Sequence, residues 1–205
     1  MRIDVPWVRD ALLVACWWLL RGAELRALKR ADVSFSDDRQ EATVRLPVSK
    51  TDQEGKGAER TLRCTCAIAR GASKWRALCP THACWRLWRR ARATGAEWLT
   101  CQDDGSRLSE RGLARAVETH LGPIARQGAL QQWGGHSCRR GGAQFLARMG
   151  VPYATIMWMG RWGSDTVLRY IREAEPDNEE LAPDAVRALM VREQRRGRGS
   201  AGRRA

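Results

Sequence analysis

Five side chains in this sequence could act together on a phosphate ester. His136 and Arg139 stand three residues apart, so on a helix they share one face, and Tyr170 follows Arg139 by 31 residues. Arg21 and Lys50 lie much earlier in the chain. Arginine keeps its charge and offers planar pairs of donors, which suit the negative charge that develops on a phosphodiester under attack. A tyrosine, with an ordinary pKa of about 10, can attack once its proton is lost or its phenolate is stabilised by cations.

The charge of the chain agrees with an anionic partner. Its 205 residues carry 36 Lys and Arg against 23 Asp and Glu, which gives a formal net charge of +13 and a pI of about 10.4. This excess favours a polyanion, most often nucleic acid, although a ribosomal site or a membrane surface would attract the same sign. No membrane-spanning helix is expected at residues 11–20, because this apolar run is only about half of the roughly 20 residues that a spanning helix needs. We expect nucleic acid and not a membrane as the partner.

The composition is that of one globular domain, and we expect the protein to be intracellular. Hydrophobic residues make up 43% and charged residues 29% of the chain, which argues against disorder throughout. Asp4, Arg9 and Asp10 precede the apolar run, unlike the start of a signal peptide. Seven scattered cysteines, an odd number, do not describe the disulfide framework of a small secreted domain. We therefore expect reduced thiols.

Hydrophobic spacing predicts the elements that must position these side chains. Helical spacing over residues 5–30, interrupted at Gly22, predicts two helices that meet near Arg21. Short β-branched and apolar stretches in residues 33–66 predict a small antiparallel sheet with a polar hairpin tip at residues 51–57. Helical patterns follow from residue 80 to Gly95, from residue 109, and at residues 137–149, 152–158, 164–171 and 185–195.

This order of elements predicts a mainly helical α+β domain over residues 1–175. The remainder, residues 176–205, is expected to hold a C-terminal helix with Asp184 as its N-cap, followed by a flexible basic tail. The tail is predicted because residues 195–205 are rich in arginine and glycine and show no apolar periodicity.

Four separated motifs carry a resemblance to a known family. They are an arginine followed three residues later by an acid, a lysine at the start of the hairpin, a histidine with an arginine, and a tyrosine. In this sequence they fall at Arg21 with Glu24, Lys50, His136 with Arg139, and Tyr170. In this order they resemble the catalytic domain of the tyrosine recombinases, also called phage-type integrases, over residues 10–172. The stretches at residues 139–143 and 160–165 are similar to the variant carried by eukaryotic mobile elements.

The resemblance implies a tyrosine recombinase-like catalytic domain that cleaves and rejoins double-stranded DNA, in site-specific recombination or integration. Tyr170 would form a covalent 3′-phosphotyrosyl link while Arg21 and Arg139 hold the phosphate. Lys50 would protonate the leaving 5′ oxygen, and His136 would assist proton transfer or orientation. No metal or other cofactor is implied, and no ATP, because one phosphate ester is exchanged for another. The protein is expected with DNA, in the nucleus if the host is eukaryotic.

One position departs from the family pattern. The family usually places a second histidine or a tryptophan directly after the glycine that lies ten residues before the tyrosine. Here Gly160 is that glycine, Arg161 follows it, and Trp162 comes one position later. Trp162, whose indole N–H is a donor, is the expected replacement, and Arg161 is the alternative.

The sequence is also compatible with two other functions. One is a non-catalytic DNA-binding protein that kept the fold; the other is nicking and closing of DNA in the manner of a type IB topoisomerase. By resemblance a complete enzyme also has a separate helical domain that closes over the other side of the DNA. We expect no counterpart of that domain in this sequence, because the first arginine motif already begins at Arg21. Family members commonly self-associate on DNA through the segment after the tyrosine, here residues 184–195.

Each residue also has an ordinary explanation. Taken alone, Tyr170 would be a half-buried core tyrosine and Arg21 would pair with Glu24. The ten tryptophans, Trp158 among them, are better explained by core packing than by base stacking. The ordered set of motifs, not any single residue, supports the catalytic interpretation.

Cysteines near the middle of the chain offer a further site. Cys64, Cys66, Cys79 and His82, with Cys84 close by, could supply the ligands of a structural zinc ion. Their spacing is not the common zinc-finger pattern, so free buried thiols are the favoured interpretation and zinc is the alternative.

Overall fold

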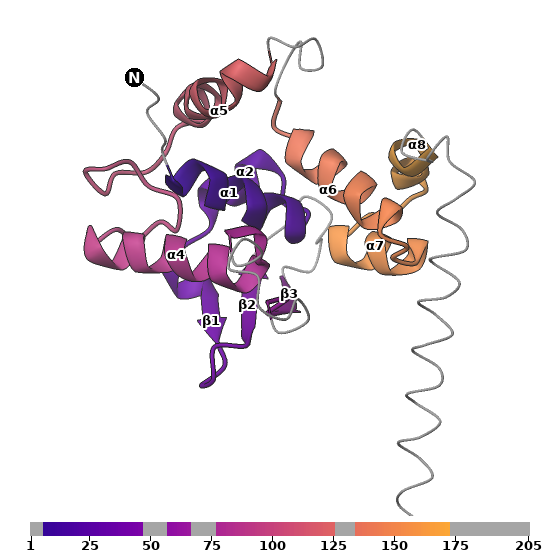
Figure 1. Ribbon diagram of the computed structural model, residues 1–205, viewed down its shortest axis with the longest axis horizontal. Helices are drawn as coiled ribbons and strands as arrows, with labels where there is room; N and C mark the ends of the chain where they lie inside the picture. Colours follow the sequence, from indigo (N-terminus) through magenta and orange to yellow (C-terminus); the bar gives the residue numbers. More distant parts are fainter. Residues whose placement is uncertain (1–5, 47–56, 67–76, 126–133, 173–205) are drawn as a thin grey trace, which may run out of the picture.

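The predicted succession of helices and a small sheet is present in the computed structural model (Figure 1), which describes residues 6–46, 57–66, 77–125 and 134–172. The fold is α+β and mainly helical, which confirms the predicted class. The helices are α1 (Pro6–Trp17), α2 (Gly22–Ala27), α4 (Pro80–Ala93), α5 (Glu110–Ala125), α6 (Ser137–Arg148), α7 (Tyr153–Gly160) and α8 (Thr166–Arg172), with a short 3-10 helix η1 (Arg30–Asp32). The strands are β1 (Val33–Phe35), β2 (Glu41–Leu46) and β3 (Ala58–Arg63).

The sheet has three antiparallel strands in the order β1-β2-β3. Val44 of β2 pairs with Val33 of β1 and with Arg60 of β3. Side chains alternate along β2, with Ala42, Val44 and Leu46 buried, so one face of the sheet packs into the core beside α4. The predicted hairpin tip at residues 51–57 and Lys50 lie outside the described residues, apart from Gly57.

Helix α1 is the centre of the fold, because it packs against both α4 and α6. Its buried face presents Val8, Ala11, Val14 and Ala15, at the spacing that a helix needs to keep them on one side. These residues belong to the main core, together with side chains from the sheet, α4 and α5. Full burial of each large aliphatic side chain there contributes about 1.5–3 kcal/mol.

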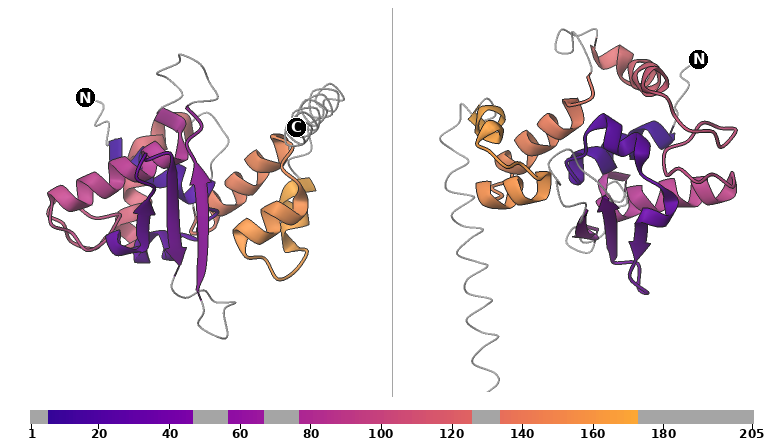
Figure 2. Two further views of the ribbon diagram at one scale, coloured as in Figure 1. Left: turned by 90° about the horizontal axis from the view of Figure 1, so that it is seen from below. Right: turned by 180° about the vertical axis from the view of Figure 1, so that it is seen from behind.

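Helices α6, α7 and α8 form a second packed group around their own small core (Figure 2). Ala143, Ile156 and Val167 come from these three helices and meet Leu19, which follows α1. At Gly142, α6 approaches the chain so closely that a β-carbon would overlap the carbonyl oxygen of Cys16. This close contact packs the group of α6, α7 and α8 against the C-terminal end of α1.

The helix boundaries differ from the sequence prediction at one informative point. The helix predicted at residues 152–158 ends at Gly160, because Arg161 takes the left-handed backbone conformation (φ 58°) and closes α7. The helix and tail predicted for residues 176–205 lie outside the described residues. Among the helices that are described, none is both long enough and apolar enough to cross a membrane.

Candidate functional site

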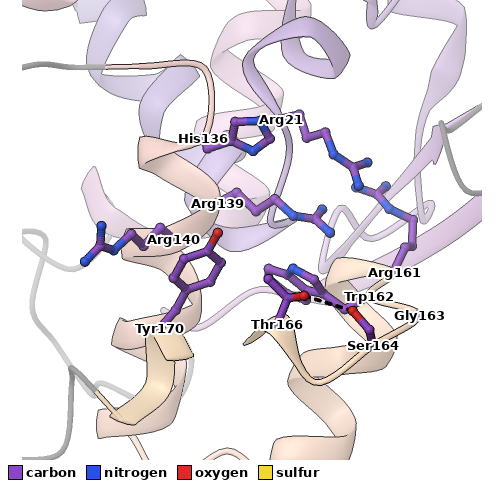
Figure 3. A pocket seen from close by; sticks show the side chains of 10 residues that line it. All are labelled: Arg21, His136, Arg139, Arg140, Arg161, Trp162, Gly163, Ser164, Thr166 and Tyr170. Atoms are coloured by element: carbon purple, nitrogen blue, oxygen red, sulfur yellow. Dashed lines mark hydrogen bonds between the residues drawn. The ribbon is translucent and has the colours of Figure 1, made fainter. Parts of the chain in front are cut away.

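A cavity of about 250 Å³ lies between the start of α2, the start of α6 and the α7–α8 turn (Figure 3). It is lined largely by cationic and hydroxyl-bearing side chains. The lining residues are Arg21, His136, Arg139, Arg140, Arg161, Trp162, Gly163, Ser164, Thr166 and Tyr170. Five of the predicted site residues thus come together, from three distant parts of the chain. The sixth, Lys50, lies outside the described residues.

The backbone joins the first arginine motif to the histidine motif. Arg21 precedes α2, and the next residue, Gly22, donates its N–H to the carbonyl oxygen of Gly135 at 2.6 Å. Gly135 directly precedes His136, which begins α6 as an exposed residue. A β-carbon at Gly22 would stand only 3.0 Å from the Cα of Gly135. The absence of a side chain at Gly22 therefore lets the two motifs meet.

Glu24 holds two of the cavity arginines. Its carboxylate accepts a hydrogen bond from Arg21 Nη1 at 2.7 Å and from Arg161 Nη2 at 2.9 Å. It also accepts the backbone N–H of Arg21 at 2.7 Å. The ordinary pairing of Arg21 with Glu24 is therefore present, but it is part of a larger arrangement. One carboxylate balances one of the two positive charges, so the cavity keeps an excess of positive charge.

Arg139 is the most buried of the cavity arginines, at 2% exposure. Its Nη1 donates to the carbonyl oxygen of Leu19 at 2.8 Å, whereas its buried Nη2 has no partner among the described residues. Its guanidinium lies over the Trp162 ring, 4.0 Å from the ring centre. Burial, followed by repulsion from Arg21 and Arg161, lowers the pKa of Arg139 to about 9. The group is still charged at neutral pH, and a nearby anion would stabilise it.

The turn after α7 brings Arg161 and Trp162, the two candidates for the position that differs from the family pattern, to the cavity. At Gly160 a β-carbon would overlap the Trp162 ring, so glycine is required for the ring to fold back over the helix end. Arg161, in its left-handed conformation, points its guanidinium toward Glu24, and its side chain is only 7% exposed. Burial lowers the pKa of Arg161, and its Nε and Nη1 lack partners within the described part of the chain. Trp162 and Arg161, the two candidates for the family's second histidine or tryptophan, therefore line the same cavity.

Tyr170 lies on α8, which packs against α6. Figure 3 shows its hydroxyl directed into the space beside Arg139 and His136. On its other side the Tyr170 ring lies near the guanidinium of Arg140, 5.6 Å from Cζ to the ring centre. The tyrosine is only partly buried, and it lines the cavity.

Comparison with solved structures identifies the fold. A crystal structure of XerH site-specific recombinase bound to palindromic difH substrate, in a post-cleavage complex, matches with a TM-score of 0.58 and 18% identity, over 89% of this chain and 47% of the recombinase. A pre-cleavage complex of XerH with difH substrate gives the same TM-score at 15% identity, over 91% and 48%. The chain has a tyrosine recombinase-like fold.

The tyrosine recombinase-like region is shorter than these structures, since the chain spans about half of their length. No protein-family model matches the sequence. No curated protein matches it either. The likeness therefore lies in the fold, where residues far apart in the chain are brought together.

Sequence reasoning missed two features near this site. Glu24 was recognised as part of a motif, but its bridge to Arg161 spans 137 residues and has no local signal. Core packing was the wrong explanation for Trp158, which is 60% exposed. The guanidinium of Arg60 lies 3.7 Å from the centre of the Trp158 ring and donates to the Trp158 carbonyl oxygen at 2.7 Å. This contact attaches the edge strand β3 to α7.

Proposed function

We propose that this protein cleaves and rejoins DNA strands through a covalent 3′-phosphotyrosyl intermediate at Tyr170. The observation that carries the proposal is a set of three buried guanidinium nitrogens without partners among the described residues, on two arginines that line the same cavity as Tyr170. They are Nη2 of Arg139 and Nε and Nη1 of Arg161. Buried donors are normally paired, so these nitrogens are suited to the oxygens of a bound phosphate.

The proposed reaction combines these cavity groups with the roles that the family resemblance implies. The Tyr170 hydroxyl gives its proton to His136 as its oxygen attacks phosphorus and forms an O–P bond, while the bond from phosphorus to the 5′ oxygen of DNA breaks. Arg21, Arg139 and Arg161 stabilise the charge that builds on the non-bridging oxygens. Lys50 gives the leaving oxygen its proton, with His136 assisting. Attack of a 5′ hydroxyl on the phosphotyrosine reverses the steps and releases Tyr170, so no ATP is needed, and the family resemblance implies no metal.

Trp162 and Arg161 have different roles at the position where the family usually has a second histidine or a tryptophan. We assign the family's position to Trp162, because its ring supports the guanidinium of Arg139. Arg161 adds a cation that the family pattern does not require. It is held by Glu24, which also holds Arg21, so the three side chains act as one unit.

The partner in this proposal is double-stranded DNA, and the overall reaction is site-specific recombination or integration. Both XerH structures are complexes with a DNA substrate named difH. Self-association on DNA, through residues 184–195 as the contact to a neighbouring copy, belongs to the same proposal.

A suicide substrate tests the covalent step. DNA in which a nick or a 5′-bridging phosphorothiolate prevents rejoining should accumulate a protein adduct on a denaturing gel. The chain has two tyrosines, so Tyr153→Phe is a matched control for Tyr170→Phe. We expect the adduct in the wild type and in Tyr153→Phe, and its complete loss in Tyr170→Phe. With the nicked substrate, release of a 5′ hydroxyl that accepts phosphate from polynucleotide kinase would establish the 3′ linkage.

The same experiment separates the two rival functions. DNA binding without an adduct over a range of sequences would favour a non-catalytic module. An adduct together with relaxation of supercoiled DNA, but no exchange of strands between two duplexes, would favour topoisomerase-like nicking and closing. Loss of the adduct in Tyr153→Phe instead of Tyr170→Phe would contradict the assignment of the nucleophile.

A further inference from the structure

A second cluster of reactive side chains lies away from the cavity, where the end of β3 meets the start of α4. Cys64 and Cys66 follow β3, Cys79 immediately precedes α4, and His82 lies in its first turn. One ligand atom from each of the four residues lies within 4.8 Å of the other three. Cys64 and Cys79 are buried, and Cys66 and His82 are partly buried.

Four of the six distances between ligand atoms in this cluster are close to those of a tetrahedral metal site, and the other two are at most 4.8 Å. His82 Nδ1 lies 3.6 Å from the sulfur of Cys64, 3.5 Å from that of Cys66 and 3.3 Å from that of Cys79. The sulfurs of Cys64 and Cys79 are 3.7 Å apart. Zinc bonds of about 2.3 Å to sulfur and about 2.0 Å to nitrogen imply ligand separations of about 3.8 Å between sulfurs and about 3.6 Å between sulfur and nitrogen. The four atoms therefore surround a point that can hold one ion.

Hydrogen bonding alone explains the cluster poorly. A ring nitrogen such as Nδ1 of His82 has either one lone pair or one proton, so it can complete one good hydrogen bond, yet three sulfurs approach it. A disulfide explains it no better, because the sulfurs of Cys64 and Cys79 are well beyond the bonded distance of about 2.05 Å. Pairing any two of the three cysteines would also leave a third thiol at the same histidine.

The position of Cys79 also favours a thiolate. Cys79 and His82 stand at the N-terminus of α4, a 14-residue helix, where the helix dipole stabilises negative charge. A zinc ion with three thiolates and one histidine carries one net negative charge. The two segments are already close, since Thr81 Oγ1 donates to the carbonyl oxygen of Leu62 at 3.4 Å.

We propose that Cys64, Cys66, Cys79 and His82 bind one structural zinc ion. All four positions are filled by protein ligands, so the ion has no open site for a substrate and its role is to hold β3 to α4. The sequence spacing, Cys-x-Cys followed by Cys-x-x-His, gave zinc only as an alternative to free thiols. The convergence of the four ligand atoms across the sheet-to-helix connection makes zinc the better explanation.

Metal analysis of the full chain, purified without chelator, tests the site. We expect one zinc ion per chain in the wild type and almost none in the double variant Cys66→Ser/Cys79→Ser. Cys84→Ala is the matched control, because Cys84 is a fully buried cysteine on the same helix that is not part of the cluster. This control should keep the full zinc content.

Cobalt substitution of the wild type makes the test independent of variant folding. Replacing zinc by Co²⁺ should produce the thiolate-to-cobalt charge-transfer absorption and the visible bands of tetrahedral coordination. Removal of the metal by a chelator should also lower the melting temperature. Absence of zinc in the wild type together with no such absorption on adding Co²⁺ would overturn the proposal. Zinc retained at full stoichiometry in Cys66→Ser/Cys79→Ser would overturn it as well.

Discussion

At the scale of single residues, the burial and charge of Arg139 suit the cavity to an anion. The side chain is almost fully buried, one of its nitrogens has no partner among the described residues, and two further arginines stand nearby. Burial and this repulsion both disfavour its charged form, which is why its pKa falls to about 9. An anion in the cavity would pair the free nitrogen and offset the repulsion.

A small anion should therefore stabilise the folded protein. Sulfate at about ten times its dissociation constant should add about 1.4 kcal/mol to the free energy of unfolding. For a chain of this size that is a rise in melting temperature of roughly 3–6 °C. The measurement is thermal unfolding in sulfate against chloride at equal ionic strength. Arg139→Gln should lose most of the rise, and Arg89→Gln, an exposed arginine of α4, should keep it. Equal rises in both variants would show that the anion binds elsewhere.

Residue types and order predicted most of this site, but not its internal contacts. Arg21, His136, Arg139, Trp162 and Tyr170 were selected by family motifs and all line one cavity. The bridge from Glu24 to Arg161 was not predicted, because it depends on a left-handed residue after α7 that turns the arginine inward. A non-glycine residue in that conformation leaves no pattern in the sequence.

At the scale of elements, the close contact between α6 and α1 determines where Arg139 lies. Arg139 is on α6 and donates to the carbonyl oxygen of Leu19, just after α1, so any separation of the helices would break that hydrogen bond. Gly142 permits the contact, because a β-carbon there would overlap the backbone at Cys16. Its neighbour Gly141 is exposed, with open space where a β-carbon would stand.

Alanine at these two adjacent glycines should have opposite effects. Gly142→Ala should lower the free energy of unfolding by roughly 1–3 kcal/mol, because the helices must move apart. Gly141→Ala should raise it by up to about 1 kcal/mol, because alanine favours a helix over glycine. Urea denaturation of both variants measures the difference. Equal stability of the two would mean that α6 does not depend on this close approach.

Hydrophobic periodicity predicted the elements well because each buries one face. The sheet at residues 33–66 and the helices that begin near residues 80, 109, 137, 152 and 164 are all present. Periodicity could not predict how α6, α7 and α8 group around Leu19, since that packing joins residues more than 100 positions apart. Spacing offered Cys64, Cys66, Cys79 and His82 as possible zinc ligands, but it could not show that their ligand atoms converge.

At the scale of the whole molecule, the net charge of +13 should govern the strength of DNA binding. Each phosphate that a basic residue neutralises releases counterions, so affinity falls steeply as salt is added. The cavity arginines account for only part of this charge, and the remainder acts over the surface without selecting a sequence.

Affinity for duplex DNA should show this salt dependence in a fluorescence titration. Contact with about four phosphates predicts a slope near −4 in a plot of log affinity against log salt, a loss of roughly a hundredfold between about 50 and 200 mM. Arg139→Gln should reduce the slope by about one. A slope close to zero would show that DNA is not the main partner.

The position of the covalent bond tests the central claim most directly. After trapping with the suicide substrate, digestion before aspartates should release residues 165–176, in which Tyr170 is the single tyrosine. Mass spectrometry of that peptide should show a nucleotide attached to Tyr170 through its 3′ phosphate. A nucleotide found on Tyr153 or on any other residue would contradict the account, and so would DNA that is bound but never attached.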